Sequence, residues 1–198
     1  MDLMTFLAQH AIESVNARGE EADIWDQFGV EIAPLVIDSV GFTRTTQAEG
    51  IVHFLTQLAV ARDITNQVLR ESDPISYVFH ADNCFAFFGS ADAALQAGIQ
   101  VRSAINGAAL PLTGGENFGL SMGIGFGTLL AAGGKDGYFG DEMNIASKLG
   151  EDIGGRDDIF LSEAAYLALN KKDGFSFEEM LGTVSGATFS YYKASEAG

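Results

Sequence analysis

Two aspartates in this sequence occupy positions where carboxylates commonly bind metal ions. Asp38 follows the apolar run 33–37, which has the length and composition of a strand buried on both faces. Asp82 lies between the apolar runs 75–80 and 84–88, where Ala-Asp-Asn predicts a tight turn. Paired carboxylates bind hard divalent ions such as Mg²⁺ together with substrate phosphates and water, which is typical of triphosphate chemistry. The alternative is structural, because aspartate is frequent at strand ends and in turns.

A short glycine-containing segment after Asp38 supports the same chemistry. Gly41, Phe42 and Thr43 lead from the strand into the next helix. The free N–H groups and the dipole at a helix N-terminus receive phosphate oxygens. We therefore expect this loop to bind phosphate beside the carboxylates.

The pattern of elements predicts how the two aspartates are positioned. After the strand that ends at Asp38, apolar residues at helical spacing predict a helix from Gln47 to Arg70, followed by the hairpin with Asp82 at its tip. A second helix, 91–106, leads to strands at 120–126 and 128–132. The order β-α-β-β-α-β predicts an α/β (α+β) fold, a ferredoxin-like split βαββαβ sandwich with helices on one face. In that sheet the first strand lies between the others, so the carboxylates come close together.

The rest of the chain extends this core at both ends. We expect a helix at 140–152, a strand at 159–161, a helix at 162–169 capped by its first serine, and a closing hairpin over 175–192. Residues 1–32 are predicted to be helical, with a break near glycine 19. The expected division is an N-terminal helical extension, 1–32, and one domain, 33–198.

Composition excludes several classes of function. The 198 residues include 11 Lys plus Arg and 27 Asp plus Glu, and the formal charge of −16 repels nucleic acid and anionic membrane surfaces. Hydrophobic residues make up 47% of the chain, as in a packed globular domain. The single cysteine, Cys84, forms no intramolecular disulfide, and neither a signal peptide nor a membrane span is evident. We expect a cytoplasmic protein without nucleic-acid or direct membrane contacts.

Three segments resemble the motifs of class III nucleotide cyclase catalytic domains. Residues 38–43, Asp-Ser-Val-Gly-Phe-Thr, resemble the family's Asp-Ile-Val-Gly-Phe-Thr signature. Ala81-Asp82 falls where the family has a Gly-Asp hairpin, and 140–149 resembles its Gly-Asp-x-Val-Asn-x-Ala-x-Arg-Leu helix. The motifs occur in the family's order, and the resemblance spans about 33–193.

This resemblance implies a head-to-tail homodimer with shared sites at its interface. One chain would hold two Mg²⁺ or Mn²⁺ ions through Asp38, Asp82 and the carbonyl of Ser39, and would bind triphosphate with 41–43. The other chain would orient the ribose with Asn144. The implied reaction converts a nucleoside triphosphate to a 3′,5′-cyclic nucleotide and pyrophosphate by metal-dependent intramolecular phosphoryl transfer.

The sequence departs from the family at the positions that recognise the base and stabilise the transition state. Val78 stands where a base-reading lysine is usual, and Gly137 stands where adenylyl cyclases have Asp or Thr. His80 and Asp136 are the remaining candidates for contacting the base. Lys148 replaces the family's transition-state arginine, which keeps the charge and loses the planar fork.

Three hypotheses follow from these residues. In the first the chain is a class III-like cyclase with an unassigned base preference, because both metal-binding aspartates are retained. In the second it is a catalytically degenerate cyclase-homology domain that dimerises or binds nucleotide as a regulatory module. This second hypothesis is favoured by the departures above and by residues 183–186, which stand where many members place a phosphate-binding lysine. The third is an unrelated ferredoxin-like binding domain.

Overall fold

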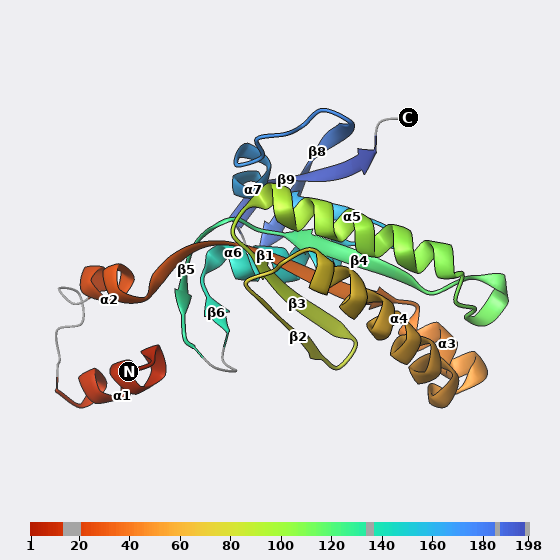
Figure 1. Cartoon of the computed structure of the whole chain (residues 1–198), viewed down its shortest axis with the longest axis horizontal. Coiled ribbons are helices and arrows are strands. Elements are labelled where there is room, and N and C mark those ends of the chain that lie inside the picture. Colours follow the sequence, from red (N-terminus) through yellow and green to blue (C-terminus); the bar gives the residue numbers. More distant parts are fainter. Residues whose placement is uncertain (14–20, 134–136, 185–186, 197–198) are drawn as a thin grey trace.

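An interior strand of the sheet, β1 (Gly29–Val40), carries the first candidate aspartate. The computed structural model describes residues 1–13, 21–133, 137–184 and 187–196. The sheet runs in the order β2-β3-β1-β4-β7-β9-β8, with β5 paired to the first part of β1 and β6 paired to β5. Figure 1 shows the hairpin β2–β3 beside β1, and β5 beside β6. The elements are, in chain order, α1 (Leu3–Glu13), α2 (Glu21–Phe28), β1 (Gly29–Val40), α3 (Phe42–Glu49), α4 (Ile51–Glu71), β2 (Ser76–His80), β3 (Asn83–Phe88), α5 (Ala91–Ala108), η1 (Thr113–Gly115), β4 (Gly119–Ile124), β5 (Gly127–Ala131), β6 (Tyr138–Phe139), α6 (Asp141–Ser147), η2 (Lys148–Ile153), β7 (Ile159–Ser162), α7 (Glu163–Leu167), β8 (Phe175–Val184) and β9 (Ala187–Glu196).

The predicted split βαββαβ core is confirmed. Strand β1 is antiparallel to both β3 and β4, so it lies between them as expected. The hairpin β2–β3 pairs from Ser76↔Phe87 to His80↔Asn83, which leaves Ala81 and Asp82 as the turn. The carboxyl end of β1 and the hairpin tip therefore lie at the same end of the sheet.

Helices cover both faces of the sheet, whereas the sequence predicted helices on one face only. Gly98 of α5 lies against Met122 and Leu35, and these side chains belong to the main apolar core. Gly123, the next residue along β4, faces the opposite way and lies against the backbone of α6 and η2. A Cβ atom at 123 would come within 2.0 Å of the Ala146 carbonyl oxygen, so glycine allows this close approach. The segment α6–η2 thus packs on the face opposite α5.

The amino-terminal boundary of the sheet differs from the prediction. Residues 29–32 were expected to be helical, but they form the start of β1 and pair with β5, from Gly29↔Leu130 to Ile32↔Gly127. Ile32 is buried there, so long-range pairing outweighs the local helical pattern. Before β1, Phe6 of α1 packs against Phe28 of α2 with ring centroids 5.4 Å apart.

Two predicted helices also have different boundaries. The helix expected over 47–70 begins at Phe42 and is broken at Gly50, so it forms α3 and α4. The helix expected over 140–152 is an α-helix only to Ser147 and continues as the π-helical segment η2. Within the described residues, no helix is long and apolar enough to cross a membrane.

Candidate active site

An open pocket of about 480 Å³ lies at the carboxyl end of β1. It is lined by residues 38–40 of β1, by residues 41–44 leading into α3, by Asp82 at the hairpin tip, and by Gly154 just after η2. The volume is within the range of small-molecule sites. The structure therefore brings together both aspartates, Ser39, Gly41, Phe42 and Thr43.

The loop between β1 and α3 presents backbone donors to this pocket. Gly41 has φ +106°, a left-handed conformation that favours glycine, and it turns the chain from the strand into the helix. The helix has no side-chain cap at this residue. Since the first N–H groups of a helix have no partner within the helix, the turn that begins at Phe42 offers donors to an anion.

Contacts from two elements hold the hairpin tip beside β1. Ser39 Oγ donates a hydrogen bond of 2.9 Å to Asp82 Oδ2. The guanidinium of Arg62 on α4 donates to the carbonyl oxygen of Ala81 and lies 5.4 Å from the ring centroid of Phe79. These contacts fix the position of the Asp82 carboxylate relative to β1.

The carboxylates create a concentration of negative charge. Burial of Asp38 and the charge of Asp82 raise the pKa of Asp38 to about 6, and Glu151 and Asp152 contribute less. Burial, and then the charges of Asp152 and Asp82, also raise the pKa of Glu151. The site is therefore electrostatically strained when every group is ionised and favours a cation.

The donor set fits a divalent ion that obtains most of its ligands from elsewhere. Two carboxylates that repel each other across a shared pocket are suitable ligands for Mg²⁺ or Mn²⁺, with phosphates and water completing the coordination. Within the described part of the chain, no group of three or more His, Cys, Asp or Glu side chains is placed to hold a metal ion. Asp38, Asp82 and the backbone of Ser39 could hold an ion only together with substrate oxygens and water.

Other predicted site residues lie outside this pocket. Asn144 is exposed on α6, and Lys148 at the start of η2 places its Nζ 2.6 Å from Asp152 Oδ2. On β2, Val78 is 53% exposed and His80 is also exposed. In a single chain, these four side chains do not line the pocket with the two aspartates.

Of the two remaining predicted residues, the structure describes Gly137. Gly137 directly precedes β6 and has φ +72°. It does not line the pocket. Asp136, the other candidate for contacting the base, lies outside the described residues.

Three charged side chains near the pocket were not predicted as site residues. Arg44 lines the pocket one residue after the phosphate-binding loop, and this adjacency was the signal that could have identified it. Glu151 and Asp152 were not among the predicted site residues either. Their proximity to Asp38 depends on the packing of η2 on β4, which local sequence does not specify.

Comparison with known proteins gives structural matches only. No family model matches the sequence, and no curated protein matches it. The adenylyl cyclase CyaB from P. aeruginosa superposes with a TM-score of 0.70 at 20% identity, over 85% of this chain and 95% of that one. The guanylate cyclase domain of RhGC from Catenaria anguillulae, in complex with GTP, superposes with a TM-score of 0.69 at 16% identity, over 84% and 96%.

The fold is that of nucleotide cyclase catalytic domains. An adenylate/guanylate cyclase/hydrolase from Silicibacter pomeroyi is also similar, with a TM-score of 0.68 at 20% identity over 84% of this chain and 96% of that one. At such identities the likeness to these cyclase domains establishes the fold, and it leaves the chemistry to the residues of the pocket.

Proposed function

We propose that this chain is a nucleotide cyclase that converts a nucleoside triphosphate to a 3′,5′-cyclic nucleotide and pyrophosphate. The observation that carries the proposal is the pocket at the end of β1, where Asp38, Asp82 and an uncapped helix N-terminus meet within a cyclase fold. Carboxylates that hold cations and backbone donors that hold phosphate are the two requirements of triphosphate chemistry.

The reaction requires positioning and charge stabilisation more than covalent chemistry. The ribose 3′ oxygen attacks the α-phosphorus, the bond from phosphorus to the pyrophosphate oxygen breaks, and the hydroxyl proton leaves to solvent. Two divalent ions, when bound, supply Lewis-acid activation of the hydroxyl and neutralise the leaving group. Asp38 and Asp82 hold these ions with the carbonyl of Ser39, and the loop 41–43 binds the phosphates.

We further propose that two copies of the chain assemble head-to-tail to complete each site. Asn144 and Lys148 do not line the pocket of their own chain, and the proposal assigns them to the pocket of the second copy. In that arrangement Asn144 orients the ribose, and Lys148 stabilises the charge that develops in the transition state. Lys148 must first release Asp152, a surface partner whose side chain is 59% exposed, and this costs little.

The base is recognised weakly in this proposal. Val78 and Gly137 offer no side-chain hydrogen bond to a base edge, so an apolar surface provides most of the contact. Such surfaces discriminate by only about 1–3 kcal/mol, whereas hydrogen-bonded recognition discriminates far more strongly. We expect activity with more than one nucleotide, with His80 or Asp136 making any polar contact.

The proposal is tested by incubating the purified chain with ATP, GTP, CTP and UTP. Each reaction contains Mg²⁺ or Mn²⁺, and mass spectrometry detects the cyclic product. We expect a 3′,5′-cyclic product that disappears in Asp38→Ala and in Asp82→Ala. Asp63→Ala, which removes an exposed carboxylate on α4, is the matched control and should retain activity.

The second candidate is a cyclase-fold module that binds nucleotide without turnover. It is favoured by Lys148 in place of an arginine and by the pairing of this lysine with Asp152. Thermal stabilisation by metal and nucleotide, with no product from any of the four triphosphates, would support this candidate over the enzyme.

A further inference from the structure

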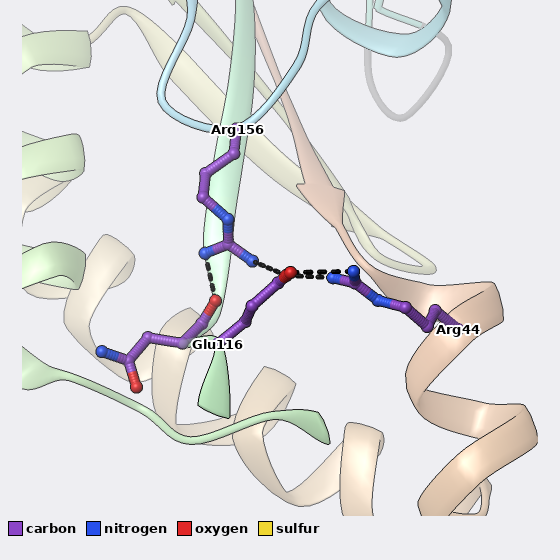
Figure 2. Close-up of polar contacts among 4 residues, drawn as sticks. Arg44, Glu116 and Arg156 are labelled. Carbon is purple, nitrogen blue, oxygen red and sulfur yellow. Dashed lines mark hydrogen bonds and ion pairs between the residues drawn. The ribbon is translucent and has the colours of Figure 1, made fainter. Parts of the chain in front are cut away.

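A cluster of three charged side chains lies at the edge of the candidate active site. Arg44 Nη1 donates a hydrogen bond of 2.8 Å to Glu116 Oε1, and Nη2 of the same arginine donates to Oε2. The second arginine, Arg156, lies 3.4 Å from the same Oε2 through its Nη2, and its Nη1 donates to the Asn117 carbonyl. Figure 2 shows both arginines approaching one carboxylate from two sides.

Arg44 can leave this cluster at low cost. Its side chain is 57% exposed and that of Glu116 is 42% exposed, so water solvates both groups once they separate. Ion pairs between exposed side chains contribute little to stability. Glu116 would also keep Arg156 as a partner, so the departure of Arg44 leaves no carboxylate without a counter-charge.

The place that Arg44 can occupy instead is the pocket itself. Arg44 and the two aspartates line the same pocket, and among the described residues that line it Arg44 is the only Lys or Arg. The whole chain carries only 11 such residues against 27 acidic ones. A polyphosphate entering this acidic pocket therefore has one protein cation within the lining, adjacent to the N–H donors of α3.

We propose that Arg44 exchanges Glu116 for the phosphates of the bound nucleotide and acts as a substrate-binding residue of the site. This inference rests on the proposed function for the identity of the ligand, a metal-bound nucleoside triphosphate. The guanidinium fork that now matches the two oxygens of Glu116 matches two phosphate oxygens equally well. Glu116 serves as the partner of Arg44 when the pocket is empty.

Calorimetric titration of the full chain tests this exchange. The probes are α,β-methylene-ATP with Mn²⁺, tripolyphosphate with Mn²⁺, and adenosine. We expect Arg44→Gln to weaken the binding of both polyphosphate probes by about tenfold or more, because a charge-assisted contact is lost. The affinity for adenosine should not change. Arg44→Lys should recover part of the affinity.

Two variants of the same cluster are the controls. Arg156→Gln removes the other arginine from Glu116 and does not line the pocket, so polyphosphate affinity should be unchanged. Glu116→Gln removes the competing carboxylate, so affinity should equal or exceed that of the wild type. A loss in either control as large as that in Arg44→Gln would overturn the proposal, because the cluster would then act only by holding the structure.

The outcomes separate this inference from the proposed function. If the wild type forms cyclic product and Arg44→Gln binds both polyphosphates as tightly as the wild type does, the proposed role of Arg44 is wrong and the proposed cyclase activity stands. If the wild type binds polyphosphate through Arg44 and forms no product, the inference holds for a binding module and the enzyme is wrong. If the wild type binds neither polyphosphate, the inference is overturned.

Discussion

Asp38 is partly buried and feels the negative charge of Asp82, and this makes folding dependent on pH. Its pKa is raised to about 6 from an ordinary value of 3.8, with burial as the main cause. Between these values the folded chain retains a proton that the unfolded chain has released. Stability therefore falls as pH rises from about 4 to 6, and the full penalty persists above that window.

Replacing Asp38 by asparagine should remove this penalty. At pH 8 without metal, we expect Asp38→Asn to exceed the wild type in unfolding free energy by about 1–2 kcal/mol, because Asp38 is only half-buried and water screens part of its charge, and to lose that advantage near pH 4. Urea unfolding at several pH values in EDTA measures the difference. Asp63→Asn, on the exposed side of α4, controls for the loss of one negative charge. A stability advantage of Asp38→Asn that does not change with pH would contradict a raised pKa of Asp38 in the folded chain.

The backbone of the hairpin tip is strained at one residue. Ala81 adopts φ +50°, a left-handed conformation that costs a residue with a Cβ atom about 1–2 kcal/mol. Glycine relieves that strain and loses part of the gain to chain entropy, so Ala81→Gly should stabilise the protein by roughly 0.5–1 kcal/mol. Thermal or urea unfolding measures the change. Ala59→Gly on α4 should have the opposite sign, with a loss of about 1 kcal/mol, and a loss at both sites would refute the strain.

At the scale of elements, the contact between α6–η2 and the sheet depends on Gly123. A methyl group there would lie 2.0 Å from the Ala146 carbonyl and 2.7 Å from the Gly150 nitrogen, and both neighbours are backbone atoms. We expect Gly123→Ala to destabilise the fold by at least about 2 kcal/mol, measured by urea unfolding. Gly107→Ala is the matched control, since a Cβ there meets nothing within 4 Å and α5 should gain about 0.5–1 kcal/mol. Equal effects at the two glycines would exclude this packing.

The elements that the sequence predicted correctly are those that local signals determine. The β2–β3 hairpin has a turn between two apolar runs, and Ser162 caps α7 by accepting a hydrogen bond of 3.1 Å from the Ala165 amide. The start of β1 and the short strand β6 were missed because only pairing with β5 stabilises them. The partner of the first segment is distant in sequence, and β6 itself, with two residues, is too short to leave a pattern.

The candidate site could likewise be predicted only in part from the sequence. Asp38 and Asp82 could be selected because each ends or interrupts an apolar run, and the predicted topology was sufficient to bring them together. The approach of Glu151 and Asp152 could not be predicted, because it depends on a π-helical segment lying across β4. The pairing of Arg44 with Glu116 joins residues 72 positions apart and likewise requires the complete fold.

At the scale of the whole molecule, the proposed shared site predicts complementation between inactive variants. Asp38→Ala and Asn144→Ala should each be inactive alone. When the two variants are mixed in equal amounts and exchange subunits, half of the dimers contain one chain of each kind. Each such dimer has one intact site out of two, so about a quarter of wild-type activity should return. Cyclic-product assays measure the recovery. A mixture of Asp38→Ala with Asp82→Ala is the control, because no mixed dimer of that pair has an intact site. Absence of recovery in the first mixture would contradict head-to-tail assembly.

Strand β1 also has a mechanical consequence. It runs without interruption for 12 residues, pairs with β5 near its start and with β3 and β4 further along, and ends beside the pocket. An extended strand of that length is roughly 40 Å long and has almost no slack. A force that pulls α2 along the strand axis therefore acts on all of these hydrogen bonds at the same time, in shear. Any movement of the strand under that force displaces Asp38. Strand β1 thus couples the position of the helices before the sheet to the position of the carboxylate in the pocket.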